Sequence, residues 1–185
     1  HNRALIGENH DQDLADLAGN AVTTEDIVRF LTAEKLTVNH LLTKAGDRGT
    51  SVHDALEDWC KTGTHPHPEI YPEAERPYVE GLCKFLTDFG PAFDIQAEVM
   101  VGSLEHQYAG RYDFRCRWGG GPMVTRTYPK RKNKIEELPA GELLIDLKTS
   151  SGVYESHKLQ LAAYELASVE DGYSPTDYQY VLHVT

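Results

Sequence analysis

The stretch GELLIDLKTSSGVYESHKLQLAAYELA, residues 141–167, restricts the fold of this chain more than any other segment. Its apolar run at 143–145 is typical of a strand that is covered on both faces. An acid, Asp146, and an amine, Lys148, follow at the end of that run. A helical pattern at 154–169 and a further strand pattern, YQYVLHV, come next. This order predicts a sheet with a helix packed against it.

The spacing of apolar residues changes at Gly90 and Pro91, from a helical period before them to alternation after them. Helices are expected over 23–36, 45–60 and 73–89, and two adjacent antiparallel strands over 93–104 and 106–118. In the helix at 154–169, we expect Leu159, Ala162, Ala163 and Leu166 to face the core. The resulting fold class is α/β or α+β, with a central mixed sheet of four or more strands, flanking helices and an N-terminal helical region.

The expected domain organisation is a loosely ordered lead-in at 1–22 followed by one domain at 23–185. Within this domain, 23–90 is helical, 93–185 holds the sheet, and 119–140 is a basic insertion that is either a hairpin or mobile. The 40% of apolar and 25% of charged residues are ordinary for a globular protein. No apolar stretch is long enough to cross a bilayer, and no targeting segment is present, so no membrane partner and a cytoplasmic location are expected.

The three cysteines, Cys60, Cys83 and Cys116, lie far apart in the sequence. This spacing argues against a disulfide framework or a zinc site and fits a reducing compartment. The formal net charge of −11 argues against a nucleic-acid partner at first. However, a basic strip interrupts the acidic chain, and screening lets such a strip hold a polyanion locally. The strip consists of Arg111, Arg115, Arg117, Arg126, Lys130, Arg131, Lys132 and Lys134, with Asp113 as its single acid.

Asp146 and Lys148 share one face of their strand because side chains alternate with a period of two. A carboxylate at this place can bind a hard cation such as Mg²⁺, and a neighbouring ammonium can stabilise charge on a phosphoryl group. Alone, the pair is a weak signal and is more typical of a solvent-facing Asp–Lys pair on an edge strand. Asp113 supplies a second carboxylate that an adjacent antiparallel strand would bring beside Asp146.

Four short motifs occur in a fixed order along the chain. They are Gly49-x-x-x-His53-x-x-x-Glu57, Ala109-Gly110-x-x-Asp113, Asp146-x-Lys148 and Gln160-x-x-x-Tyr164. Together they resemble the RecB-like exonuclease branch of the PD-(D/E)XK nuclease superfamily, over about residues 46–185. This branch includes the RecB and AddB nuclease domains, CRISPR-associated exonucleases and phage exonucleases. The resemblance implies a restriction-endonuclease-like core.

The resemblance also implies roles for individual residues. The implied metal ligands for Mg²⁺ or Mn²⁺ are His53, Glu98, Asp113, Asp146 and the backbone carbonyl of Leu147. The implied catalytic residues are Asp113, Asp146, Lys148, Gln160 and Tyr164, with the last two steadying the lysine and the DNA phosphate. DNA contacts are expected from Arg111, Arg115, Arg117, Lys130, Arg131, Lys132 and Lys134. Each of three residues also has a purely structural alternative. His53 could be a core or capping histidine, and Glu98 a solvated strand carboxylate. Glu57 could pair with Arg48 or anchor its helix.

Two features depart from the family pattern. The stretch between Asp113 and Asp146 is longer than the usual tight hairpin, because it contains the basic insertion. Some relatives bind an iron–sulfur cluster through four cysteines, three of them after the Gln-Tyr helix, but here no cysteine follows Cys116. No iron–sulfur cluster is therefore expected.

These observations predict a metal-dependent DNA exonuclease that acts in recombination, repair or phage DNA processing, alone or with other repair proteins. The alternatives are a nuclease-fold DNA-binding module without turnover and a structure-specific endonuclease. Ligation requires a neutral imidazole, so activity is expected to fall as the pH drops through about 6.5, the ordinary pKa of histidine.

Overall fold

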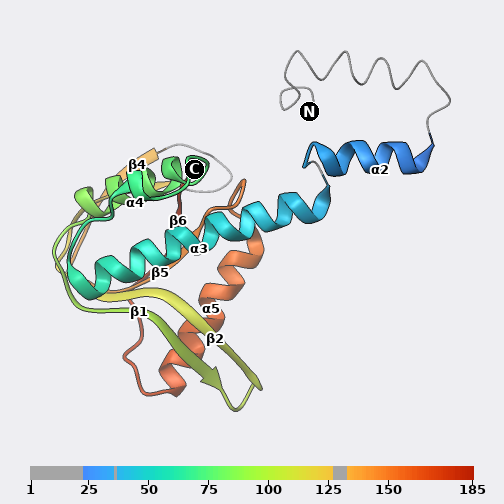
Figure 1. The fold of residues 1–185 in the computed structure, drawn as a ribbon. Helices are drawn as coiled ribbons and strands as arrows, with labels where there is room; N and C mark the ends of the chain where they lie inside the picture. Colours follow the sequence, from blue (N-terminus) through green and yellow to red (C-terminus); the bar gives the residue numbers. More distant parts are fainter. Residues whose placement is uncertain (1–22, 36, 127–132) are drawn as a thin grey trace. The chain divides into compact units, whose positions relative to one another are not determined.

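The computed structural model describes residues 23–35, 37–126 and 133–185 (Figure 1). Its elements are α2 (Thr24–Ala33), α3 (Val38–Thr62), η2 (Pro68–Ile70), α4 (Arg76–Asp88), β1 (Ala92–Ser103), β2 (Tyr108–Trp118), β3 (Gly121–Arg126), β4 (Asn133–Leu138), β5 (Gly141–Lys148), α5 (Glu155–Glu170) and β6 (Tyr178–His183). The chain divides into two units, His1–Lys44 and Ala45–Thr185, which are described separately. The predicted lead-in at 1–22 and the insertion residues Lys130, Arg131 and Lys132 lie outside the described residues.

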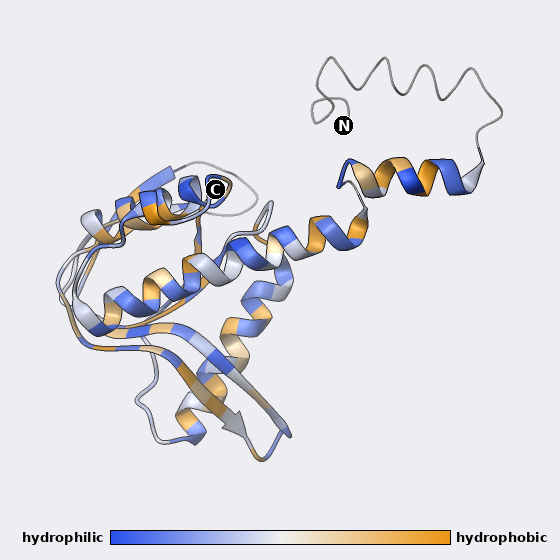
Figure 2. Ribbon diagram, viewed as in Figure 1, coloured by the Kyte–Doolittle hydropathy of each residue, from blue (hydrophilic) through white to orange (hydrophobic). Residues whose placement is uncertain are grey.

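The first unit contains α2, which begins where the sequence predicts. Thr23 caps the helix: its hydroxyl accepts a hydrogen bond from the Asp26 amide, and the Asp26 carboxylate accepts one from the Thr23 amide. No residue of α2 is buried, and Ile27 and Val28 are about half exposed. Figure 2 shows apolar bands between the polar ones along this helix.

The second unit contains a mixed four-stranded sheet in the order β1-β2-β5-β6. β2 pairs antiparallel with both β1 and β5, whereas β5 and β6 are parallel and are joined through α5. The predicted fold class is therefore confirmed: the protein is α+β, with a mixed sheet flanked by helices and an N-terminal helical region. The sequence predicts either a hairpin or a mobile segment for the basic insertion. Its described part forms the antiparallel hairpin β3–β4.

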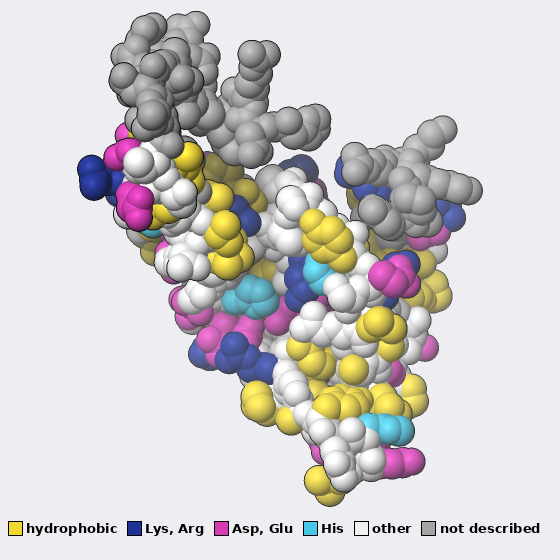
Figure 3. All heavy atoms as spheres, turned by 90° about the vertical axis from the view of Figure 1, so that its right-hand side faces the viewer, with side chains coloured by type: hydrophobic (Ala, Val, Ile, Leu, Met, Phe, Trp, Pro, Cys, Tyr) yellow, Lys and Arg dark blue, Asp and Glu magenta, His cyan; other side chains and the backbone are white. Residues whose placement is uncertain are grey.

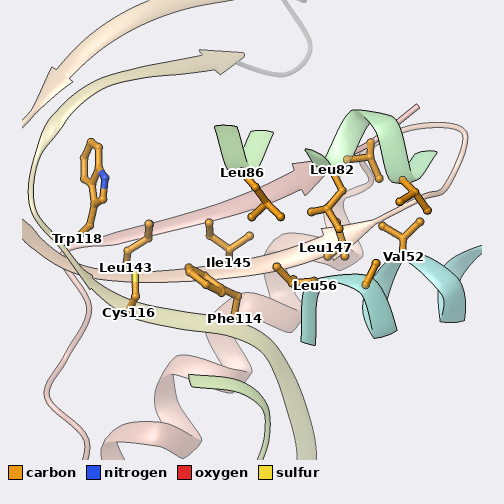
Figure 4. Packing of buried hydrophobic residues seen from close by; sticks show 13 residues of the cluster. Val52, Leu56, Leu82, Leu86, Phe114, Cys116, Trp118, Leu143, Ile145 and Leu147 are labelled. Carbon is orange, nitrogen blue, oxygen red and sulfur yellow. The ribbon is translucent and has the colours of Figure 1, made fainter. Parts of the chain in front are cut away.

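Helices cover both faces of this sheet. On one face, Leu143, Ile145 and Leu147 of β5 pack in a cluster with residues of α3 and α4, such as Leu56 and Leu82 (Figure 4). On the other face, a smaller cluster joins the sheet to α5; its buried members are Val101, Tyr112, Leu144, Leu161 and Ala167. The expectation that both faces of the strand at 143–148 are covered is thus confirmed, because its apolar residues divide between the two clusters.

The expected packed face of α5 is wrong. Leu159 is 68% exposed and Leu166 is 42% exposed, whereas Leu161, Ala167 and Ser168 are buried. Apolar residues occur on more than one side of this helix, so a spacing of three and four residues fits two rotational settings.

Two helix boundaries also differ from prediction. α3 begins at Val38, well before the expected start at residue 45. Gly46 and Gly49 lie inside the helix and interrupt its apolar pattern, so the sequence pattern does not show its first turns. α4 begins at Arg76, with a proline in its first turn, where the missing amide proton is tolerated. Within the described residues, no helix is both long and apolar enough to cross a membrane.

Candidate metal centre

Three carboxylates form a row across three neighbouring strands. In the register of β1 and β2, Ala97 pairs with Phe114 and Val99 with Tyr112, so Glu98 and Asp113 fall between these two pairs. The last pair between β2 and β5 is Phe114 with Ile145, so Asp113 and Asp146 come one step beyond it. Antiparallel register therefore brings together acids that are far apart in sequence.

Asp113 lies where β2 and β5 stop pairing. Its Oδ2 accepts a hydrogen bond of 2.6 Å from the backbone amide of Leu147. The carboxylate thus satisfies an amide just beyond the last regular pair of the two strands. This bond fixes the acid beside the peptide of Leu147, the residue whose carbonyl the family resemblance implies as a ligand.

His53 reaches the same place from α3. Its Nδ1 lies 3.1 Å from Oε1 of Glu98 and 3.3 Å from Oδ1 of Asp113. The buried residues Val52 and Leu56, on either side of it in sequence, fix the rotation of the helix. The ligand atoms of His53, Glu98 and Asp113 all lie within 4.8 Å of one another. Three of the predicted metal ligands therefore meet in one cluster.

The third predicted carboxylate, Asp146, is fully buried beside this cluster. Its Oδ1 accepts a hydrogen bond of 2.7 Å from the ammonium of Lys148. Its Oδ2 is buried and has no hydrogen-bond partner among the described residues. A buried carboxylate oxygen without a donor is costly in a metal-free protein and is a natural place for a cation.

Burial and neighbouring charges shift two pKa values in the centre. Burial acts to lower the pKa of His53, but hydrogen bonds and charge interactions with Asp113 and Glu98 outweigh it and raise that pKa to about 9. Burial raises the pKa of Asp146 to about 6, against the opposing effect of Lys148. The proton on His53 is thus held more tightly than an ordinary pKa near 6.5 implies. The expected pH window of ligation moves up accordingly.

Arg111 contacts the centre directly, a feature that the sequence analysis missed. Its Nε lies 2.7 Å from Oε2 of Glu98, as an ion pair without the alignment of a hydrogen bond. Its position two residues before Asp113 on the same strand is the signal that could have revealed this contact. At neutral pH, the three carboxylates of the row are therefore balanced by three cations: Arg111, Lys148 and the protonated His53.

Gln160 and Tyr164 pair with each other on α5. The amide nitrogen of Gln160 donates a hydrogen bond of 2.5 Å to the hydroxyl of Tyr164. The Tyr164 ring lies so close to Gly110 that a Cβ there would overlap it, which explains the glycine three residues before Asp113. Among the described residues, neither side chain has a hydrogen bond to Lys148, so the expected steadying of the lysine is not a direct contact in this state.

Two of the remaining candidates lie outside the centre. Glu57 forms an ion pair of 2.8 Å with Lys61 on the surface of α3. Arg115 requires a correction: its side chain is 4% exposed, bonds the carbonyl of Ser174 and lies near Glu142 and Glu165. A buried guanidinium with these partners is not available to a DNA phosphate.

Arg117 and Lys134 are exposed, but each already forms an ion pair with a carboxylate. Arg117 lies 3.1 Å from Asp94, and Lys134 pairs with Glu136. Trp118, beyond which the hairpin follows, lies five residues from Asp113 along β2, which is about 17 Å for an extended strand. The hairpin therefore leaves β2 well away from the acids, measured along the strand.

Acidic side chains gather beside a histidine on one face of the molecule, with Lys and Arg side chains to either side (Figure 3). Such a mixture of charges differs from the broad positive surface of a protein that binds only the nucleic-acid backbone.

No protein-family model, curated protein or solved structure matches this chain. The geometry of the candidate centre and the motifs of the sequence are therefore the grounds for a functional proposal.

Proposed function

We propose that the protein is a divalent-metal-dependent deoxyribonuclease that hydrolyses phosphodiester bonds, acting as an exonuclease. The observation that carries the proposal is the convergence of His53, Glu98 and Asp113 within 4.8 Å, next to the ion pair between the buried Asp146 and the half-buried Lys148. Two carboxylates and an imidazole can hold a divalent cation, and a nearby lysine can offset charge on a phosphoryl group.

The donor set fits Mg²⁺ or Mn²⁺. Carboxylate oxygens suit both cations, and an imidazole nitrogen suits Mn²⁺ better than Mg²⁺. His53, Glu98 and Asp113 would hold the ion, and the unpaired Oδ2 of Asp146 supplies a further oxygen beside them. A bound cation would polarise the scissile phosphate and lower the pKa of a water molecule.

The remaining chemistry falls to the chain itself. Lys148, with its ammonium 2.7 Å from Asp146, is placed to offset negative charge that develops on the phosphoryl oxygens. Asp146 holds this lysine in position, and the Leu147 amide holds Asp113. Gly110 and Tyr164 keep α5 close to β2 just before Asp113.

The order of the four sequence motifs supports placement in the RecB-like branch of the PD-(D/E)XK nucleases. DNA is accordingly the proposed substrate, and recombination, repair or phage DNA processing is the proposed setting. Partnership with other repair proteins belongs to the same proposal.

The test is incubation of end-labelled linear DNA with the protein in Mn²⁺, Mg²⁺ or EDTA. We expect cleavage with either metal and none with EDTA, and a loss of at least about 100-fold in Asp113→Asn and Asp146→Asn. Glu57→Gln, on the same helix as His53 but outside the centre, is the matched control and should cleave normally. Cleavage in EDTA, or near-normal cleavage by either Asn variant, would contradict the proposal, and binding without cleavage would favour the DNA-binding alternative.

A further inference from the structure

Glu98 is held between two cationic groups. One carboxylate oxygen lies 3.1 Å from Nδ1 of His53, and the other lies 2.7 Å from Nε of Arg111. The Glu98 side chain is only 8% exposed, whereas that of Arg111 is 59% exposed. A candidate metal ligand is therefore paired, from the solvent side, with an arginine that has room to move.

The contact between Arg111 and Glu98 is incomplete. The carboxylate oxygen that faces Arg111 is buried and accepts no aligned hydrogen bond. Among the described residues, Arg111 has no other partner, so both of its Nη groups are free. A guanidinium that offers only Nε to an acid retains most of its donors for a second anion.

Arg111 is also close enough to the centre to meet a phosphate. It lies on β2 two residues before Asp113, a separation of about 7 Å along a strand. The other arginines of this strand are committed elsewhere: Arg115 is buried under α5, and Arg117 pairs with Asp94. Among the described arginines of β2, Arg111 alone borders the three ligands.

We propose that Arg111 exchanges partners: it neutralises Glu98 in the metal-free protein and contacts a DNA phosphate once a divalent cation has taken over that carboxylate. This inference rests on the proposed function, and it links metal loading to substrate binding. A cation at Glu98 repels the guanidinium and replaces its charge. A phosphate then offers Arg111 a bidentate partner that the buried acid does not.

If Arg111 exchanges partners, Arg111→Gln should strengthen Mn²⁺ binding and weaken the effect of Mn²⁺ on DNA binding. In Arg111→Gln, Mn²⁺ no longer competes with a cation for Glu98, so Mn²⁺ should bind about 3- to 10-fold more tightly, as measured by calorimetry. Arg117→Gln removes an arginine of equal exposure on the same strand, one that pairs with the exposed Asp94 instead of Glu98, and should leave Mn²⁺ affinity unchanged. Arg111→Lys keeps the charge and should bind Mn²⁺ like the wild type.

The second measurement is fluorescence anisotropy with a labelled, phosphorothioate-linked thymidine octamer, which resists hydrolysis. Mn²⁺ should strengthen octamer binding by the wild type about 10-fold or more, and much less in Arg111→Gln. Unchanged or weaker Mn²⁺ binding by Arg111→Gln would overturn the exchange, as would tighter Mn²⁺ binding with an undiminished gain in octamer affinity. Failure of the wild type to hydrolyse DNA while these effects hold would reject the proposed function alone.

Discussion

Glu98 and Asp146 carry an energetic cost that the fold tolerates at the candidate centre. Glu98 has a φ of +54° within a strand, a conformation that costs a non-glycine residue about 1 kcal/mol or more. Asp146 keeps an unpaired carboxylate oxygen in the interior. Both features lie at the candidate centre, and the Glu98 carboxylate contacts His53. Residues arranged at the expense of stability are typical of functional sites.

The shifted pKa values make metal-free stability depend on pH. For His53, the folded-state pKa of about 9 lies above the ordinary 6.5, so its contribution is complete below pH 6.5 and is lost as the pH rises towards 9. For Asp146, the pKa of about 6 means that its burial is tolerated best in acid and opposes folding fully above pH 6. The Asp146 effect develops between about pH 4 and 6 and is constant above that, so His53 supplies the pH dependence above neutrality.

We therefore expect the protein in EDTA to lose on the order of 2 kcal/mol of unfolding free energy between pH 6.5 and 9.5, seen as a lower Tm. His53→Gln should remove most of this slope, and excess Mn²⁺ should offset it by binding the folded state. A Tm that stays constant over this range in EDTA would contradict the charge balance described for the centre.

Substitution of Lys148 distinguishes a role in the chemical step from a role in substrate binding. Because its ammonium lies against Asp146 rather than in solvent, Lys148→Ala should lower kcat by a factor of about 10²–10³. Steady-state kinetics on end-labelled DNA measure this effect. A change confined to KM would reassign Lys148 to substrate binding.

At the scale of the element, the sequence predicts what local patterns determine. Alternation identifies β1 and β2, the Thr23 cap identifies α2, and the run at 143–145 identifies β5. The rotation of α5 depends instead on which of its apolar sides meets Tyr112 and Leu144, and no local pattern contains that information. The contact of Arg111 with Glu98 depends on cross-strand neighbours in the same way.

The close approach of α5 to β2 gives an element-scale prediction. A Cβ at Gly110 would overlap the Tyr164 ring, so Gly110→Ala should destabilise the protein by about 1–3 kcal/mol and shift α5. Gly46→Ala is the control: it lies inside α3 with no atom within 4 Å of the added Cβ, and should be neutral or stabilising by up to about 1 kcal/mol. Urea unfolding measures both. Equal effects of the two substitutions would refute the close packing at Gly110.

At the scale of the whole molecule, the net charge of −11 says nothing about where the basic side chains lie. The sequence predicts DNA contact for the basic strip as a group. The structure divides its described members into three groups. Arg115 is buried and structural; Arg117, Arg126 and Lys134 are exposed and contact Asp94, Asn133 and Glu136; Arg111 lies at the centre. Position in the fold, rather than charge, decides which of them can meet a phosphate.

The mode of attack on DNA is also a property of the whole molecule, because the ligands alone do not distinguish exonucleases from endonucleases. The exonuclease proposal depends on His53, which the resemblance places in the RecB-like branch and which lies 3.1–3.3 Å from two carboxylates here. We expect release of short products from linear single- or double-stranded DNA in Mn²⁺, with covalently closed circles left intact. Because an imidazole is a better ligand for Mn²⁺ than for Mg²⁺, the preference for Mn²⁺ should shrink in His53→Ala. Circles that are first nicked or linearised are the matched substrate control, since they share sequence and length with the closed form. Ready cutting of closed circles would reject the exonuclease assignment and favour a structure-specific endonuclease built on the same centre.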